Sequence, residues 1–516
     1  MQQTTTSGGV TAAGHPATAQ AASDILKEGG NAFDAAVAAM LSACVAEPVL
    51  ASLGGGGFLN AKPAEADPVV YDFFAHTPIK KQPIPSIDFY PIEADFGTAS
   101  QTFHIGMGSI ATPGFVRGLF AIHRDLCSFP MQLLMEPAIR LAKSGVRINR
   151  FQHLITRIIA PILKSTPDVF ALNCSPTDSE RLINEGELHQ QAELADFLDS
   201  LHREGEALFY AGEAGKALVD DSIHQGGHLR QEDLARYQVI KRSPLAHCYR
   251  DTRVVINPLP SLGGTLIAFA LGLLESQPLP SLRAGNNRHL SCLARTIGLT
   301  QQMRKEQSGE MAKILKSNIR EHYLQILMEG GICSRGTTQI SIADRKGNLA
   351  SMTLSNGEGS GYVVPGTGIT LNNMLGEEDL NPGGFHHWPL NRRIASMMAP
   401  TLVFQNDGRT IVTGSGGSNR IRSAILQVIS NLIDFNMPLQ EAVDHPRIHY
   451  EDDLLSLEPG VEPRVLRSLA KEFPRLQYWE AQNLFFGGAH TVTIDSKGRL
   501  SGVGDARRGG VAIDVS

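Results

Sequence analysis

The chain has 516 residues, of which 42% are hydrophobic and 19% are charged, a balance that excludes a disordered chain and allows a large core. The formal net charge of −6 comes without long runs of one sign, so neither nucleic acid nor an anionic membrane is indicated as a partner. We therefore expect a small-molecule substrate.

The cysteines and the N-terminal residues bear on the compartment. The first twenty residues contain neither a basic region nor an apolar stretch of the kind found in Sec-type signals. The most apolar segment, 266–275, is shorter than the roughly 18 residues of a membrane span and predicts a core helix. Widely spaced cysteines without a CxxC pair are typical of a reducing compartment, and we expect a cytoplasmic protein. These cysteines are Cys44, Cys127, Cys174, Cys248, Cys292 and Cys333.

Two alanine-rich helices are predicted near the N-terminus. Residues 16–30 begin with a proline and end with two glycines, which mark the start and the stop of a helix. Asn31 can cap the next helix, and Asp34, three residues on, occupies the second position of a capping box. Pro48 ends this helix. Alanine lets helices approach a neighbour closely, so both helices are expected to serve packing.

A run of four glycines, 54–57, follows these helices. A phosphate-binding loop would require a following GK[ST] or a GxGxxG spacing, and both are absent here. Glycine also allows two backbones to approach closely because it has no Cβ. We therefore expect tight backbone packing near a site rather than nucleotide binding.

The texture of the sequence changes after residue 336. Residues 112–330 alternate helical stretches with loops and predict a mostly helical half. Beyond it, polar turns that contain glycine separate short alternating strands and predict hairpins. These turns are 345–348, 406–409 and 496–499, and helices are predicted at 418–435 and 462–473. The pattern favours an α+β arrangement of layers.

The first hairpin brings hydroxyl groups together. With a three-residue loop at 345–347, paired positions sum to 692 and Thr337 lies opposite Ser355; a two-residue loop places Thr338 there instead. Threonine and serine are also common in strands for structural reasons, so the hairpin alone does not decide between strand pairing and chemistry. Either register places a second hydroxyl close to the threonine pair.

A hydroxyl at neutral pH needs a base, and neither a histidine nor an aspartate near this hairpin supplies one in a triad. If the peptide bond before Thr337 is cut, the new α-amine, with a pKa of about 7.7 to 8.0, can take the proton of the same residue's Oγ. Gly336 tolerates the strained backbone that such a cut requires. Ser355 would orient the nucleophile by a hydrogen bond.

An acyl-transfer site also needs donors for an oxyanion. Residues 411–426 read as a strand, a glycine-rich turn and a helix. The first N–H groups of a helix have no intrahelical acceptor and lie at the positive end of its dipole. Gly417 and Ser418 are therefore the candidate donors.

Ten segments, given at the end of this paragraph, occur along the chain in the same order as the motifs of a known family. Together they resemble the γ-glutamyltransferase (γ-glutamyl transpeptidase, glutathione hydrolase) family of N-terminal-nucleophile hydrolases. The resemblance implies a four-layer αββα sandwich with a proenzyme that cuts itself between Gly336 and Thr337. A large chain, 1–336, and a small chain, 337–516, would then pair with each other. The segments are 29–39, 53–58, 112–120, 137–146, 226–239, 258–275, 337–348, 360–374, 401–418 and 504–510.

The resemblance also assigns roles by position. It implies Thr337 as the nucleophile, Ser355 as its hydroxyl partner, and Gly417 with Ser418 as the oxyanion hole. It implies substrate-binding roles for three further residues. These are Asn356, where the family has a threonine-x-asparagine pattern, Glu377, which would bind the substrate amine, and Ser396, from a serine pair that reads Ala395-Ser396 here. Neither a cofactor nor a metal ion is predicted.

The chain departs from the family where the α-carboxylate of a γ-glutamyl group is bound. Phe74 stands at the place of the family's arginine, and a bidentate guanidinium is hard to replace. Arg392 or Arg393 could supply the charge from another direction, or could form a solvated pair on a loop. His386 and His387 are adjacent in a loop without a carboxylate partner, a pattern more typical of structural histidines than of metal ligands.

We expect a self-processing amidase or acyltransferase that acts on glutathione-like γ-glutamyl amides, with water or an amine as acceptor. The lost arginine favours, as an alternative, an acylase for another amide, similar to the cephalosporin-acylase branch of the family. A hypothesis from a different class is an unprocessed, non-catalytic binder of a small ligand. Such a binder would not need Thr337, Ser355 and the glycine turn together.

Overall fold

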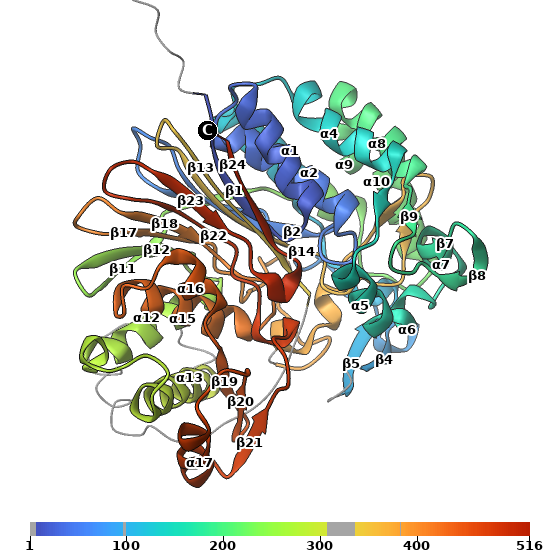
Figure 1. Cartoon of the computed structure of the whole chain (residues 1–516). Helices are drawn as coiled ribbons and strands as arrows, with labels where there is room; N and C mark the ends of the chain where they lie inside the picture. Colours follow the sequence, from blue (N-terminus) through green and yellow to red (C-terminus); the bar gives the residue numbers. More distant parts are fainter. Residues whose placement is uncertain (1–6, 96–99, 307–335, 382, 516) are drawn as a thin grey trace, which may run out of the picture.

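Two β-sheets packed face to face form the centre of the computed structural model, which describes residues 7–95, 100–306, 336–381 and 383–515 (Figure 1). Within these ranges one sheet has seven strands and the other has six. In spatial order the first contains β10 (Ile240–Arg242), β3 (Val69–Asp72), β2 (Gly56–Lys62), β14 (Leu349–Ser355), β13 (Thr338–Asp344), β1 (Gly9–Ala13) and β24 (Val511–Val515). The second contains β11 (Leu245–Tyr249), β12 (Thr252–Ile256), β17 (Thr401–Phe404), β18 (Thr410–Thr413), β22 (Thr491–Ile494) and β23 (Leu500–Val503).

Helices cover the outer face of each sheet, which gives the predicted four layers (Figure 1). A small apolar cluster lies between the sheets and includes Val10 of the first and Val412 of the second, both fully buried. The helices over the first sheet include α1 (Pro16–Lys27), α2 (Ala32–Ala46), α3 (Phe115–Leu126), α4 (Met131–Ser144) and α8 (Ala192–Glu204). Those over the second include α12 (Leu262–Glu275), α13 (Asn287–Glu306) and α15 (Arg420–Ile433).

Short elements surround these layers. The helices are α5 (Arg150–Ile158), α6 (Ala160–Leu163), α7 (Pro167–Asn173), α9 (Ala207–Tyr210), α10 (Glu213–His224), α11 (Gln231–Arg236), α16 (Leu439–Asp444) and α17 (Pro463–Glu472). The strands are β4 (Tyr90–Asp95), β5 (Ser100–Ile105), β6 (Val146–Arg147), β7 (Cys174–Ser175), β8 (Asp178–Leu182), β9 (Leu188–His189), β15 (Val363–Val364), β16 (Ile369–Thr370), β19 (Ile448–Glu451), β20 (Leu454–Leu457) and β21 (Arg475–Tyr478).

The helix signals read from the sequence are confirmed. Asn31 accepts hydrogen bonds from the N–H groups of Phe33 and Asp34, and Asp34 accepts from the Asn31 N–H in return, so the capping box at the start of α2 is complete. Every residue of α2 is buried. The predicted core helix at 266–275 is the C-terminal part of α12.

The N-terminal half contributes strands as well as helices. β1, β2, β3 and β10 come from it and join β13, β14 and β24 in one sheet. β13 pairs with β1 on one side and with β14 on the other, and β14 pairs with β2. Strands from both sides of residue 336 therefore belong to one hydrogen-bonded sheet.

The register of the β13–β14 hairpin is the one predicted for a three-residue loop. Thr338 pairs with Leu354 and Ile340 with Met352, so paired positions sum to 692. Gly347 in the loop has a φ of +88°, a conformation that favours glycine. The hairpins predicted at 406–409 and 496–499 are confirmed as the β17–β18 and β22–β23 connections.

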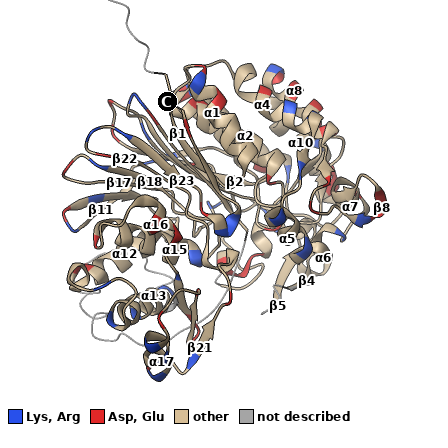
Figure 2. Ribbon diagram, viewed as in Figure 1, with Lys and Arg blue, Asp and Glu red and all other residues tan. Residues whose placement is uncertain are grey.

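Charged residues of both signs are spread around the outside of the ribbon, with long uncharged stretches along the central strands (Figure 2). In the ranges that the structure describes, every helix is too short or too polar to cross a lipid bilayer.

Candidate active site

Thr337 lies immediately before β13, with its side chain among buried atoms. Thr337 is 5% exposed and Ser355, at the end of β14, is 7% exposed. The Thr337 hydroxyl donates to the Gly336 carbonyl oxygen at 2.6 Å, and the Ser355 hydroxyl donates to the same oxygen at 3.0 Å. Ser355 Oγ in turn accepts the Gly357 N–H at 3.1 Å. Two hydroxyl groups thus converge on the carbonyl of the peptide bond where cleavage is predicted.

Glu358 contacts the residue that precedes this peptide bond, and the sequence analysis did not single it out. Its Oε1 accepts the Gly336 N–H at 2.8 Å, and the residue is 6% exposed. Glu358 is only three residues from Ser355 in the sequence, but that spacing does not reveal its contact with Gly336.

The four glycines at 54–57 pack against the same region, as predicted. A Cβ on Gly55 would lie 2.4 Å from the Ser355 carbonyl oxygen, and one on Gly57 would lie 2.5 Å from the Thr353 carbonyl oxygen. Such distances are too short for any side chain. The run therefore serves close approach of β2 to β14.

The turn predicted to hold the oxyanion lies against Thr337. A Cβ on Gly416 would be 2.0 Å from the Thr337 carbonyl oxygen, so only glycine fits there. Gly417 and Ser418 follow, with φ values of +120° and +50°, and α15 begins two residues later. The Ser418 hydroxyl donates to Asp379 Oδ2 at 2.9 Å, which fixes the turn from its side-chain end. The structure thus brings together Thr337, Ser355 and this turn.

Arg508 is a second residue that the sequence analysis missed. Its guanidinium donates to the Thr337 carbonyl oxygen and to the Leu484 carbonyl oxygen, each at 3.3 Å. Arg508 is 3% exposed, and burial lowers its pKa to about 10. Its Nη2 would lie 3.0 Å from a Cβ on Gly417. A buried cation therefore stands beside both Thr337 and the glycine turn.

A buried ion cluster holds the segment that carries Arg508. Asp505 pairs with Arg447 at 2.6 Å and with Arg507 at 3.3 Å, and Glu458 also binds Arg507. Burial alone would raise the pKa of Asp505, but the two guanidinium groups and the Ala489 N–H lower it below its usual range. Each of these residues is at most 5% exposed. The cluster places the last turn before β24 next to the candidate site.

Asp505→Asn is expected to lower the free energy of unfolding by about 3 to 5 kcal/mol, because two buried guanidinium groups then share one carboxylate. The folded pKa of Asp505 lies below its unfolded value of about 3.9, so its contribution is present above that pH and is lost as the pH falls below it. Urea unfolding of both proteins at pH 7 and at lower pH measures this difference. Asp407→Asn, at an exposed ion pair with Arg409, is the control and should unfold like wild type.

The second threonine of the pair faces a different carboxylate. The Thr338 hydroxyl donates to Glu47 Oε2 at 2.6 Å, and the Thr18 hydroxyl donates to Glu47 Oε1 at 2.8 Å. Burial raises the pKa of Glu47, an effect that these two hydrogen bonds oppose. Neighbouring side chains alternate along a strand, so Thr337 and Thr338 point to different sides of the sheet. Thr338 therefore anchors the start of β13 and does not belong to the candidate site.

The predicted substrate-binding residues are not all placed together. Glu377 lies beside the loop after Ser355, since a Cβ on Gly357 would be 2.4 Å from Glu377 Oε1. Asn356 is 2% exposed and lines a neighbouring pocket. The Ser396 hydroxyl accepts the Met398 N–H at 3.0 Å, and the Ser396 carbonyl accepts N–H groups at the start of α12. In the described ranges, the hydrogen bonds of Ser396 thus involve Met398 and the start of α12, and none joins it to Gly336 or Thr337.

The residues considered as replacements for the family's arginine have other roles. Phe74 is 1% exposed and its ring stacks on Phe58. Arg393 is 9% exposed, pairs with Asp72 at 3.3 Å and donates to the Phe74 carbonyl. The interpretation as a solvated pair is therefore wrong for Arg393, which is held in the core, whereas Arg392 is exposed.

The two adjacent histidines lie in an aromatic setting. The ring of His386 packs against Phe89 at 4.6 Å between centroids, and against His228 at 6.4 Å. His387 is exposed. In the part of the chain that the structure describes, no three histidine, cysteine or acidic residues are grouped as metal ligands would be.

Comparison with known proteins identifies the family. The family model described as gamma-glutamyltranspeptidase matches residues 18–515. The chain belongs to this family. This confirms the resemblance read from the sequence motifs and the prediction of an enzyme.

The relatives of this gamma-glutamyltranspeptidase family member carry two kinds of name. The acylase ACY 1 proenzyme of Pseudomonas sp. (strain V22) is 28% identical over 544 residues, which cover 99% of this chain and 94% of that protein. The glutathione hydrolase proenzyme of Escherichia coli (strain K12) is 29% identical over 528 residues, which cover 94% and 88%. Among solved structures, the cephalosporin acylase from Bacillus halodurans superposes with a TM-score of 0.86 at 23% identity, covering 98% of this chain and 96% of that one. This last likeness confirms the predicted fold.

Proposed function

We propose that the chain cuts itself between Gly336 and Thr337 and then acts as an amidohydrolase or acyltransferase with an N-terminal threonine. The observation that carries this proposal is the convergence of the Thr337 and Ser355 hydroxyl groups on the Gly336 carbonyl oxygen. The cut would give a large chain, 1–336, and a small chain, 337–516, which pair through the shared sheet. Relatives described as proenzymes support processing of this kind.

In the first step, Thr337 Oγ attacks the Gly336 carbonyl carbon, and the carbon–nitrogen bond to Thr337 breaks. The nitrogen takes the hydroxyl proton and becomes the free α-amine, while Gly336 is left as an ester on Oγ. Water then hydrolyses this ester and frees Thr337. Ser355 supports the step because its hydroxyl donates to the oxygen on which negative charge develops.

In the second phase, the α-amine takes the Oγ proton as Thr337 attacks the carbonyl carbon of an amide substrate. The N–H groups of Gly417 and Ser418 stabilise the oxyanion of the tetrahedral intermediate. The amine of the substrate leaves with the proton that the α-amine received, and the acyl group stays on Oγ. Water or a second amine then takes the acyl group.

The acyl group is proposed to lack the α-carboxylate of a γ-glutamyl group. Phe74 carries no charge, Arg393 is held by Asp72 and backbone carbonyls, and Arg508 already donates to the carbonyl oxygens of Thr337 and Leu484. A substrate carboxylate would have to compete with these partners. An unmatched carboxylate in a closed pocket is costly. Names among the relatives include acylases. Glu377 supports the other candidate, a glutathione-like γ-glutamyl amide, because its carboxylate could bind the substrate's ammonium group.

Rates of 4-nitroaniline release from γ-glutamyl, glutaryl and pentanoyl 4-nitroanilides decide between these acyl groups. We expect kcat/KM to be at least about tenfold higher for the uncharged pentanoyl compound than for either carboxylate, since a desolvated charge without a partner costs more than 1.4 kcal/mol. The fastest turnover with the γ-glutamyl compound would support the γ-glutamyl candidate instead. An intact chain that binds these compounds without turnover would support the non-catalytic binder.

A further inference from the structure

This inference rests on the proposed function. In that function, the first acyl group that the site holds is the chain's own Gly336. When Thr337 Oγ displaces the nitrogen, the Gly336 carbonyl carbon becomes an ester on Oγ with its Cα and N still attached. A substrate acyl group forms the same ester on the same atom. The contacts of Gly336 therefore indicate which groups the site accepts next to an acyl carbonyl.

Two contacts of Gly336 restrict such a group. Its N–H donates to Glu358 Oε1 at 2.8 Å, and Glu358 is 6% exposed. A Cβ on Gly336 would lie 3.1 Å from the Gly357 carbonyl oxygen, which is tighter than most such contacts, and 3.4 Å from Leu50 Cδ2, which is an ordinary contact. The Gly357 carbonyl thus disfavours a branched carbon there. The site thus fits a CH2 group between the acyl carbonyl and an N–H donor, and a buried carboxylate receives that donor.

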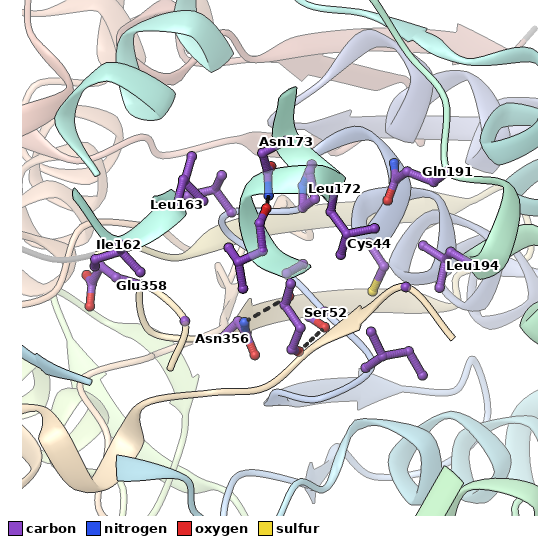
Figure 3. Close-up of a pocket in the computed structure, with 18 of the residues that line it drawn as sticks. Cys44, Ser52, Ile162, Leu163, Leu172, Asn173, Gln191, Leu194, Asn356 and Glu358 are labelled. Atoms are coloured by element: carbon purple, nitrogen blue, oxygen red, sulfur yellow. Dashed lines mark hydrogen bonds between the residues drawn. The ribbon is translucent and has the colours of Figure 1, made fainter. Parts of the chain in front are cut away.

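Glu358 also lines a pocket whose walls are mostly apolar (Figure 3). Asn173 and Gln191, which lie away from Glu358 in this view, donate their side-chain amides to backbone carbonyls, each at 2.8 Å. Their amide nitrogens are therefore already hydrogen-bonded to the protein itself. The apolar walls include Ile162, Leu163, Leu172, Leu194 and Ile369.

A second acceptor lines the same pocket. Asn356 Oδ1 accepts no hydrogen bond among the described residues, although Asn356 is only 2% exposed. A buried acceptor without a donor is costly, and a ligand with N–H groups would supply one. Both polar side chains of this loop thus present acceptors, which favours a ligand that donates over one that carries an anion.

We propose that the mature site selects amides of N-acylated glycine, with Glu358 accepting the glycine N–H and the apolar pocket taking the N-acyl chain. γ-Glutamyl and glutaryl groups place a methylene where glycine has its N–H. A methylene cannot donate to Glu358, so the buried carboxylate would lose a charge-assisted hydrogen bond.

A matched pair of substrates tests the N–H group alone. Acetylglycyl 4-nitroanilide and 4-oxopentanoyl 4-nitroanilide differ only in N–H against CH2 at the position facing Glu358. For the cleaved wild-type protein we expect kcat/KM to be about 10- to 100-fold higher for the glycyl compound. A ratio near one, or a preference for the oxopentanoyl compound, overturns the proposal.

The length of the N-acyl chain tests whether that chain binds in the apolar pocket. In the series acetylglycyl, butanoylglycyl and hexanoylglycyl 4-nitroanilide, kcat/KM should rise by about fourfold for each added methylene that is buried. A flat or falling series would show that the N-acyl chain lies outside the pocket and would overturn that part of the assignment.

Variants of Glu358 test whether this residue is responsible for the preference for the glycyl compound. Glu358→Ala should bring the ratio of the matched pair close to one, and Glu358→Gln should leave an intermediate ratio because an amide oxygen is a weaker acceptor than a carboxylate. Glu378→Gln, which changes an exposed carboxylate without an assigned role, is the control and should keep the wild-type ratio. An unchanged ratio in both Glu358 variants overturns the role of Glu358. If Glu358→Ala does not mature, the wild-type ratio and Glu358→Gln still decide.

The failure of this inference differs from the failure of the proposed function. Cleaved protein that hydrolyses both members of the pair equally well contradicts only the selection by Glu358. A chain that stays whole, or cleaved protein that turns over no 4-nitroanilide, contradicts the proposed function instead.

Discussion

Thr337→Ala is expected to leave one chain of 55.7 kDa that hydrolyses no amide. Wild type should give two fragments, of 336 and 180 residues, or about two-thirds and one-third of that mass. Alanine has no hydroxyl to attack the Gly336 carbonyl or a substrate, so both reactions lose their nucleophile. We expect a loss of at least about 10⁴-fold in kcat/KM. A denaturing gel, intact-mass measurement and 4-nitroaniline release check both effects.

Thr337→Ser is the matched control, because serine keeps both the hydroxyl and, after the cut, the α-amine. It should mature and turn over substrate, although more slowly. The mechanism is contradicted if Thr337→Ala still separates into two fragments at this bond. It is equally contradicted if wild type hydrolyses amides while it remains a single chain.

The local features of the site could be predicted from the sequence because they depend on neighbouring residues. The length of a hairpin loop fixes which residues of its two strands pair. With the turn located by Gly347, either loop length considered from the sequence placed Ser355 near Thr337, and the structure has the three-residue loop. Capping depends on residues three apart, which made the start of α2 visible in Asn31 and Asp34.

Contacts between distant segments could not be predicted in the same way. Arg508 meets Thr337 across 171 residues of sequence, and Glu47 meets Thr338 across 291. Nothing in the spacing of these residues reveals that the fold joins them. Glu358 is nearer in sequence, but its side chain reaches Gly336 only because the loop after Ser355 turns back on itself.

The strands of the N-terminal half were also difficult to predict. β1 is Gly-Val-Thr-Ala-Ala, and all five residues are buried because a helix layer covers one face and the second sheet covers the other. A strand buried on both faces shows no alternation of polar and apolar residues. The four layers were therefore expected from the family resemblance, whereas hydrophobic periodicity indicated only helices in this half.

Ser355→Ala is expected to slow maturation by about 10²- to 10³-fold, the usual effect of removing one donor to a developing oxyanion. The Ser355 hydroxyl donates to the Gly336 carbonyl oxygen at 3.0 Å, and this oxygen gains negative charge when Thr337 attacks. The Thr337 hydroxyl cannot replace this donor, because its own proton leaves during the attack. The rate is measured as the appearance of the 180-residue fragment by intact mass in freshly purified protein.

Ser360→Ala separates this effect from general damage to the loop. Ser360 lies five residues further on, is also buried, and donates to the Leu371 carbonyl oxygen at 3.1 Å instead of to Gly336. Its loss removes a buried hydrogen bond of the same kind and should leave maturation within a few-fold of wild type. If both variants mature equally slowly, the role of Ser355 is structural. If Ser355→Ala matures at the wild-type rate, polarisation of the Gly336 carbonyl must come from other donors, and Arg508 beside Thr337 becomes the next residue to change.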